Sequence, residues 1–253
     1  MARRRTIGAE LVDDGTSFRV WAPSRSRVAV VIGRDELALD REEDGYFSKT
    51  IDGVRAGTRY RFRLDDERDA FPDPASRFQP YAPHGASVVV DPHAFRWSDA
   101  RWRGASLDGR VIYEMHVGTF TQDGTFAAAT DCLHSIAELG ANVIEVMPVN
   151  EFAGRFGWGY DGVDPWAPSH LYGKPDGFRR LVDTAHSLGL AVILDVVYNH
   201  FGPYGCYMSK YASQYFTKKY TTAWGDAINF DDAGATGVRE FFAENAAYWI
   251  DEF

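Results

Sequence analysis

The chain has 253 residues, enough for one large or two modest domains, and its 45% hydrophobic and 25% charged residues are typical of an ordinary globular protein. A formal net charge of −9 argues against a nucleic-acid-binding surface, which needs a basic stripe. No apolar run reaches the roughly 18 residues of a membrane span, no secretory signal follows the basic start, and two cysteines make no disulfide framework. We therefore expect a cytoplasmic protein without nucleic-acid or membrane partners.

The first 105 residues have the two-residue period of β-strands. Four runs show it: Ser17–Pro23, Arg27–Gly33, Tyr46–Ile51 and Arg59–Leu64. Asp-Gly, Pro-Ser and Ala-Gly pairs separate these runs, and short strands at this spacing are typical of an antiparallel sandwich. The proline-rich stretch that follows, from Phe71 to Pro80, is predicted to be an extended linker lying over a neighbouring part of the chain.

Residues 106–253 change to a strand–helix alternation. Strands are predicted at Arg110–Val117, Ala141–Val149 and Leu190–His200, with helices between and after them. Pro175 marks the start of one helix and Gly189 its exit. The last helix has an apolar face composed of Val238, Phe241, Phe242, Asn245 and Trp249.

Near-continuous apolar strands alternating with helices predict a parallel sheet covered by helices. No Gly-x-Gly-x-x-Gly follows any strand, which favours a (β/α)8 barrel over a dinucleotide-binding sheet. A barrel needs eight units and about 250 residues, whereas only three units are present. The final helix also carries Asp251 and Glu252 in its last turn, where the helix dipole prefers cations. We therefore expect a fragment that ends before the fourth barrel strand.

Several segments together resemble the α-amylase superfamily of glycoside hydrolases, most of all its maltooligosyltrehalose trehalohydrolases. The similar segments are DPASRFQP, YEMHVGTFTQDGTF, VMPVNEFAGRFGWGYDG, DVVYNH, YNHFGPYGCY and YFTKKYTTAWGDAINFDD. They follow one another from about Gly8 to Phe253. The resemblance implies an immunoglobulin-like module over residues 1–105, an incomplete catalytic barrel over residues 106–253, and a small inserted subdomain at about residues 201–237.

The resemblance also implies an activity, namely hydrolysis of the α-1,4 bond next to the terminal trehalose of a maltooligosyl trehalose. Such enzymes use a nucleophilic and an acid carboxylate about 5–5.5 Å apart. By resemblance both follow Phe253, so no catalytic residue is assigned here and the isolated chain is expected to be inactive. An α-glucan or maltooligosyl trehalose is the expected partner, with no cofactor and no metal.

Five substrate-binding residues are implied by the same resemblance: Tyr160, Asp161, Asp195, Asn199 and His200. Asp195 would support the cleavage subsite, His200 would hydrogen-bond the sugar there, and Tyr160 would stack against the pyranose ring. Asn199 matches a position that binds calcium in many α-amylases, although trehalohydrolases are not generally regarded as calcium-dependent. Polar residues at the carboxyl ends of barrel strands face the active site, which explains polar groups at the end of an apolar strand.

Structural roles compete with these functional ones. Asp195 could be a carboxylate bonded to backbone amides, His200 a loop histidine, and Tyr160 a plug of the barrel mouth. Glu114 and His116 alternate along one strand as metal ligands could, but no His-Glu-x-x-His motif or cysteine pair supports a metal site. Glu145 is predicted to be a paired interior carboxylate. Core packing is favoured over a glycan surface for three tryptophans: Trp21, Trp97 and Trp102.

Other functions remain open. A branching or debranching enzyme shares the two-module layout, although the Gly159-Tyr160-Asp161 stretch favours a trehalohydrolase. A non-catalytic glucan-binding protein would need only the first module and the predicted substrate-binding residues. A phosphate-binding barrel enzyme would need a cradle after strands seven and eight.

Overall fold

The computed structural model describes residues 3–106 and 108–253. Two antiparallel sheets come first. One contains β1 (Gly8–Val12), β2 (Gly15–Trp21), β6 (Tyr46–Asp52) and β5 (Asp40–Arg41). The other contains β4 (Asp35–Ala38), β3 (Val28–Ile32), β7 (Arg59–Leu64), β8 (Ala70–Phe71) and β9 (Ser87–Val88).

The two sheets share one apolar core, to which β2, β3, β6 and β7 all contribute buried side chains. Phe18 and Val20 of β2 belong to this core, as does Phe62 of β7, because alternate residues of each strand point inward. The four predicted strands are all confirmed. The others were not predicted because most have only two to five residues, too few to show a period.

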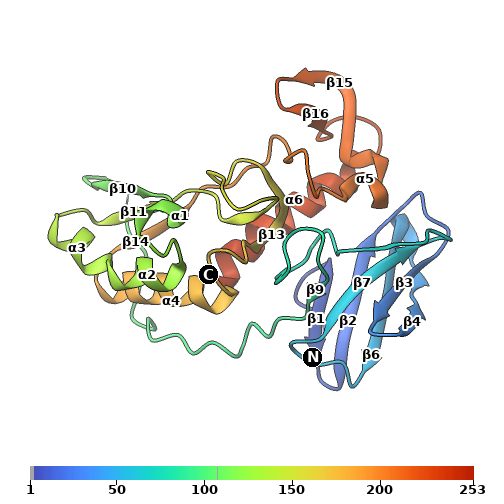
Figure 1. Cartoon of the computed structure of the whole chain (residues 1–253), viewed down its shortest axis with the longest axis horizontal. Helices are drawn as coiled ribbons and strands as arrows, with labels where there is room; N and C mark the ends of the chain where they lie inside the picture. The colour runs from blue at the N-terminus through green and yellow to red at the C-terminus, as the bar shows by residue number, and fades with distance from the viewer. Residues whose placement is uncertain (1–2, 107) are drawn as a thin grey trace.

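The predicted proline-rich linker is mostly buried. Residues 71–77 are shielded from solvent, and the Arg77 guanidinium lies 4.1 Å from the Trp166 ring and 4.5 Å from the Tyr248 ring. Tyr60 donates a hydrogen bond of 2.7 Å to Asp73 in the same segment. The stretch therefore packs between the sandwich and the rest of the chain. The open connection seen in Figure 1 is the later segment that follows β9.

A three-stranded parallel sheet lies at the other end of the molecule (Figure 1), in the order β10 (Ile112–Met115), β11 (Val143–Val146) and β14 (Ala191–Leu194). Four helices accompany it: α1 (Val117–Phe120), α2 (Phe126–Asp131), α3 (Leu133–Glu138) and α4 (Pro175–Ser187). The helix predicted between the first two parallel strands is divided at Cys132, whose N–H bonds to the Ala129 carbonyl three residues back and tightens the turn. This arrangement is consistent with part of a (β/α)8 barrel.

A hairpin that was not predicted lies between β11 and α4. It pairs β12 (Asn150–Phe152) with β13 (Gly162–Pro168). Two prolines within β13 argue against a strand in the sequence alone. The Pro165 carbonyl accepts hydrogen bonds from Asn245 Nδ2 at 2.9 Å and Trp249 Nε1 at 3.0 Å, so β13 is fixed to the last helix.

Between β14 and the last helix, the region predicted as an inserted subdomain contains α5 (Met208–Tyr211), a 3₁₀ turn (Ser213–Tyr215), β15 (Phe216–Thr222) and β16 (Gly225–Ile228). The β15–β16 hairpin projects from the molecule (Figure 1). Its base is attached to the sandwich, because the Tyr211 hydroxyl donates to the Pro72 carbonyl at 2.8 Å and the Tyr211 ring belongs to the sandwich core.

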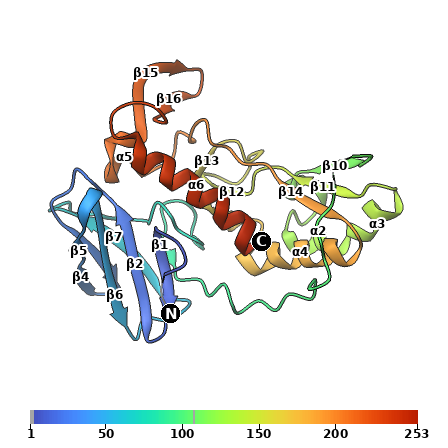
Figure 2. The ribbon, with the colours of Figure 1, turned by 180° about the vertical axis from the view of Figure 1, so that it is seen from behind.

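The last helix, α6 (Ala235–Glu252), runs diagonally between the sandwich and the parallel sheet, as Figure 2 shows from behind. Its predicted apolar face is confirmed, since all five of those side chains are buried. Among the described residues, α6 and the other helices are too short or too polar to cross a membrane.

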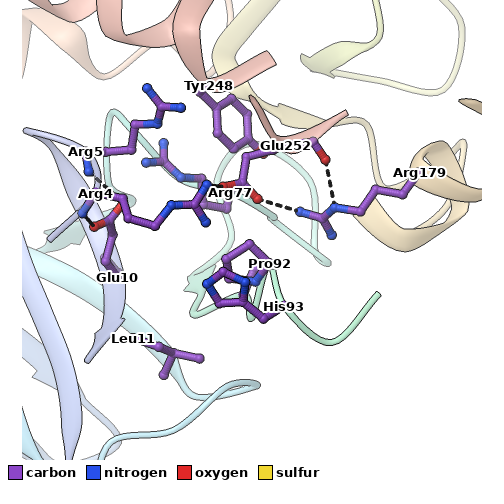
Figure 3. A pocket seen from close by; sticks show the side chains of 12 residues that line it. Arg4, Arg5, Glu10, Leu11, Arg77, Pro92, His93, Arg179, Tyr248 and Glu252 are labelled. Atoms are coloured by element: carbon purple, nitrogen blue, oxygen red, sulfur yellow. Dashed lines mark hydrogen bonds and ion pairs between the residues drawn. The ribbon is translucent and has the colours of Figure 1, made fainter. Parts of the chain in front are cut away.

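Arginines balance the acidic last turn of α6, which in the sequence alone counts as one sign of a fragment (Figure 3). Arg5 bonds to Asp251 and to the Ala247 carbonyl, and Arg4 lies 3.1 Å from Glu252. Arg179 of α4 contacts Glu252 twice, donating to its backbone carbonyl at 3.0 Å and to its carboxylate at 3.2 Å. These contacts supply the positive charge that the helix dipole requires there.

Candidate functional site

The carboxyl ends of the three parallel strands meet at one edge of the sheet. His116 follows β10, Met147 follows β11, and Asp195 follows β14. Two backbone hydrogen bonds continue the ladder across this edge, from Met147 N to the Met115 carbonyl at 3.0 Å and from Asp195 N to the Val146 carbonyl at 2.9 Å. Asp195 is therefore held by the sheet itself, directly beyond its last residue.

The loop between β12 and β13 places Tyr160 over this edge. Gly159 has φ +92°, and a Cβ there would lie 2.0 Å from the Pro148 carbonyl oxygen. Only glycine therefore lets the backbone at position 159 come this close to Pro148, just after β11. The Tyr160 hydroxyl then donates a 2.9 Å hydrogen bond to Asp195 Oδ2. Its ring remains 40% exposed, which leaves a face open for contact with a ligand.

Negative charge surrounds the Tyr160 hydroxyl. Its pKa is raised to about 12, first by the hydrogen bond to Asp195, then by burial and by the charges of Asp195, Glu114 and Glu145. The phenol therefore stays protonated at neutral pH and orients the Asp195 carboxylate. Within the described residues, Oδ1 of Asp195 has no side-chain donor, so this oxygen is free to accept a hydrogen bond from a ligand.

Asn199 and His200 form a second pair, in which His200 Nδ1 lies 3.0 Å from Asn199 Oδ1. His200 is buried and Asn199 is exposed. Gly202 N bonds to the Gly162 carbonyl at 2.9 Å, which joins the segment after β14 to the start of β13 beside Asp161. The structure thus brings Tyr160 and Asp195 into contact and places the other predicted residues on adjoining segments. Across the described chain, no hydrogen bond connects His200 to Asp195.

His116 contacts other side chains of the protein through its whole ring. Its Nδ1 lies 3.0 Å from Thr119 Oγ1 and its Nε2 lies 3.1 Å from the Tyr172 hydroxyl, so both ring nitrogens are occupied. Burial lowers the pKa of His116, which favours the neutral imidazole. Within residues 3–106 and 108–253, no group of three His, Cys, Asp or Glu side chains is placed to hold a metal ion.

Glu145 lacks the pairing predicted for it. The parallel register puts Glu114 directly beside it, and among the described residues no ion pair joins either carboxylate to a cation. Two like charges at this edge explain part of the raised Tyr160 pKa. Glu145 is half-buried, and the sequence pattern did not reveal its neighbour Glu114, because register is set by the whole sheet.

The three tryptophans pack against protein. Trp21 is buried, donates to the Asp44 carbonyl at 3.0 Å, and lies against Gly237 of α6. Trp102 stacks on His186 at 4.3 Å, and Trp97 lies edge-on to a phenylalanine at 4.9 Å while remaining 37% exposed.

Comparison with known proteins decides the family. Residues 89–252 match the description "Alpha amylase, catalytic domain". The chain belongs to the α-amylase family. The matched range contains the parallel sheet, both hairpins and every residue of the candidate site.

Members of this family with curated names are similar over nearly the whole chain. It is 49% identical over 249 residues to the malto-oligosyltrehalose trehalohydrolase of Saccharolobus solfataricus, covering 98% of this chain and 44% of that protein. The enzyme of the same name from Deinococcus radiodurans is 43% identical, covering 94% and 39%. A 1,4-alpha-glucan branching enzyme of Corynebacterium jeikeium is 30% identical, covering 98% and 38%. The chain thus spans less than half the length of these relatives.

Two solved structures have the same fold over nearly the whole chain. A Salmonella typhimurium crystal structure assigned as an α-amylase superposes with a TM-score of 0.94 at 43% identity, covering 99% of this chain and 42% of that one. Pullulanase from Paenibacillus barengoltzii, solved with maltohexaose and α-cyclodextrin, gives 0.84 at 21% identity, covering 98% and 47%, and shows the fold alone.

Two aromatic residues near the site were missed from the sequence. Trp224, in the turn of the β15–β16 hairpin, stacks on His200 with 5.8 Å between ring centroids. Trp158 lies two residues before Tyr160 and packs edge-on against His116 at 4.9 Å. The hairpin that carries Trp224 was not predicted, so nothing in the sequence connected it to His200.

Replacing Asp195 by Asn should lower the pKa of Tyr160 from about 12 towards its ordinary value of about 10, because the main cause of the shift is the bond to that carboxylate. Tyrosine ¹³Cζ NMR at about pH 11 would show Tyr160 largely ionised in the variant and protonated in the parent. Tyr198 is the internal control, since burial raises its pKa to about 12. An unchanged Tyr160 titration would contradict the hydrogen bond.

Proposed function

We propose that this chain forms the glucan-binding part of a maltooligosyltrehalose trehalohydrolase. The observation that carries the proposal is the 2.9 Å hydrogen bond between Tyr160 and Asp195 at the carboxyl edge of the parallel sheet. In this role the exposed Tyr160 ring stacks on a pyranose, Asp195 accepts from its hydroxyls, and His200 hydrogen-bonds the same sugar. Asp161 and Asn199 support the two loops from their exposed positions.

The curated relatives support the trehalose specificity. Proteins named as trehalohydrolases are 39–49% identical to this chain, whereas the branching enzyme is 30% identical. The pullulanases with the same fold are solved with maltooligosaccharides, which supports an α-glucan as the ligand. Retaining hydrolysis of such a ligand needs two carboxylates about 5–5.5 Å apart.

We further propose that the 253 residues alone do not hydrolyse glucan. By resemblance, the nucleophile and the acid follow Phe253, and a covalent pathway requires both. The proposal includes an immunoglobulin-like form for residues 1–105, a barrel portion over residues 106–253 with an inserted subdomain at about residues 201–237, and action in the cytoplasm without a cofactor.

A chimera tests the activity. The chain would be joined to the part of the Saccharolobus solfataricus enzyme that follows the matched region, and trehalose release from maltooligosyl trehalose would be measured by chromatography. We expect trehalose from the chimera, and about a hundredfold less from its Asp195→Ala variant, because the sugar at the cleavage site loses its positioning group. Products of glucan-chain transfer without trehalose would instead support a branching enzyme, which the Corynebacterium jeikeium relative makes the second candidate.

A separate experiment tests the isolated chain. Titration calorimetry with maltoheptaose should give binding heat without any product, and Tyr160→Ala should remove most of that binding. Trehalose produced by the isolated 253 residues would refute the proposed inactivity. Absence of maltoheptaose binding would refute the proposed glucan-binding role.

A further inference from the structure

The segment that follows β14 carries three of the predicted binding residues without regular structure of its own. Asp195, Asn199 and His200 all lie within residues 195–202, which form neither helix nor strand. A segment without an internal hydrogen-bond ladder keeps its position only through bonds to its surroundings. The contacts that attach residues 195–202 to the rest of the chain therefore determine where these three side chains lie.

Backbone hydrogen bonds attach the segment at its two ends. The Asp195 N–H donates to a carbonyl of β11 at 2.9 Å, and the Gly202 N–H donates to the Gly162 carbonyl at 2.9 Å. Tyr198 lies between these ends and is half-buried. Its hydroxyl donates a 2.6 Å hydrogen bond to Oδ1 of Asn245 on α6. The middle of the segment is thus attached through a side chain.

Asn245 is the polar member of the otherwise apolar buried face of α6, and its side chain is fully buried. Its Nδ2 donates to the Pro165 carbonyl of β13 at 2.9 Å. A carbonyl oxygen carries no proton, so the amide nitrogen must face Pro165 and the amide oxygen must face the Tyr198 hydroxyl. Burial of an amide is unfavourable unless both of its ends are bonded, and here two separate segments of the chain bond them.

The two partners of Asn245 depend on it unequally. The Pro165 carbonyl also accepts a hydrogen bond from Trp249 Nε1 at 3.0 Å, so β13 keeps one attachment to α6 without Asn245. Among the described residues, the Tyr198 hydroxyl has no second hydrogen-bond partner. Loss of the Asn245 amide would therefore release the middle of residues 195–202 and leave β13 in place.

We propose that Asn245 is a positioning residue, which fixes residues 195–202 through Tyr198 and thereby places His200 in the candidate site. The inference rests on the proposed glucan-binding function, in which His200 hydrogen-bonds the sugar. Tyr198 precedes His200 by only two residues, so a shift of the tyrosine is passed directly to the histidine backbone. The His200 ring stacks on Trp224 of the projecting hairpin, with 5.8 Å between ring centroids, and this contact reports its position.

Tyr198→Phe and Asn245→Leu test the proposal in the 253-residue chain. NMR at one fixed pH would follow the His200 Cε1–H resonance, and titration calorimetry would measure maltoheptaose binding. We expect both variants to change this chemical shift, because the imidazole moves relative to the Trp224 ring. We also expect each to weaken maltoheptaose binding about tenfold. Tyr198→Phe removes one oxygen atom, so it keeps the test decisive if Asn245→Leu does not fold.

Trp249→Phe is the matched control, because it removes the other donor to the Pro165 carbonyl from the same face of α6 and leaves the Tyr198 bond intact. It should lower stability in urea unfolding. The His200 resonance should stay unchanged, and maltoheptaose affinity should stay within about twofold of the parent chain. A purely structural role of Asn245 would instead give the same pattern in all three variants.

The outcomes separate this inference from the proposed function. A His200 resonance that is unchanged in Tyr198→Phe and Asn245→Leu overturns the positioning role, as does an equal change in Trp249→Phe. If the parent chain binds no maltoheptaose, the glucan-binding function fails, while the His200 resonance still decides the role of Asn245. A changed resonance with unchanged affinity supports the positioning of His200 and refutes its contact with the sugar.

Discussion

The Gly159→Ala variant is expected to bind maltoheptaose at least about a hundredfold more weakly than the parent chain. Alanine at this position would place its Cβ 2.0 Å from the Pro148 carbonyl oxygen, so the loop must move away from β11. Tyr160 would move with it and lose its 2.9 Å bond to Asp195. A displacement of about 1 Å can cost a catalysed step about a hundredfold in rate, and we expect a loss of similar size in affinity here. Titration calorimetry measures the loss.

Gly154→Ala is the matched control for this variant. Both glycines have φ +92°, so alanine pays the same backbone strain of about 1 kcal/mol at each. A Cβ at Gly154, however, would meet nothing within 4 Å. We expect the control to lose stability slightly in urea unfolding and to bind glucan normally. Equal binding losses in the two variants would show that backbone strain, and not the close approach to Pro148, sets the position of Tyr160.

Arg179→Ala should lower the free energy of unfolding by about 3 kcal/mol. The Arg179 side chain is 1% exposed and pairs with the buried Glu252 carboxylate. Its Nε–H also donates to the Glu252 backbone carbonyl at the end of α6. Removing one partner of a buried pair costs about 3–5 kcal/mol. We expect the lower end, because Arg4 remains 3.1 Å from the other oxygen of Glu252. Urea unfolding followed by circular dichroism gives the value.

Its neighbour Arg180 provides the control, since it lies on the same helix and is exposed. Arg180→Ala should change stability by no more than about 0.5 kcal/mol. A second variant, Arg179→Ala combined with Glu252→Gln, should recover part of the loss by removing the uncompensated charge. Equal destabilisation in the Arg179 and Arg180 variants would show that the contact with Glu252 contributes nothing.

The elements that the sequence predicted well are those with a local signal. The parallel strands are continuous apolar runs, Pro175 is a helix start, and the buried face of α6 repeats at helical spacing. The elements that were missed depend on distant partners. Strand β13 carries two prolines and is stabilised by Asn245 and Trp249. The arginines at the end of α6 lie up to 246 residues away in the chain.

The candidate site was predictable in part for the same reason. Asp195 follows an apolar strand, and a carboxyl-end position on a parallel sheet places it at an edge where Tyr160 also arrives. The contact of His200 with Trp224 depends on a hairpin with little sequence signal. The side-by-side position of Glu114 and Glu145 depends on strand register, which periodicity alone does not determine.

The attachment of α6 at both ends to the sandwich has a consequence for how the protein is made. Trp21 contacts Gly237 and Tyr46 bonds to Glu240 near the helix start, while Arg5 holds Asp251 near its end. A ribosome that adds about 5–20 residues per second finishes the sandwich on the order of ten seconds before α6 emerges. During that interval Trp21, Tyr46 and Arg5 lack their partners on α6, so the contacts that join this helix to the sandwich form only after the sandwich has been synthesised.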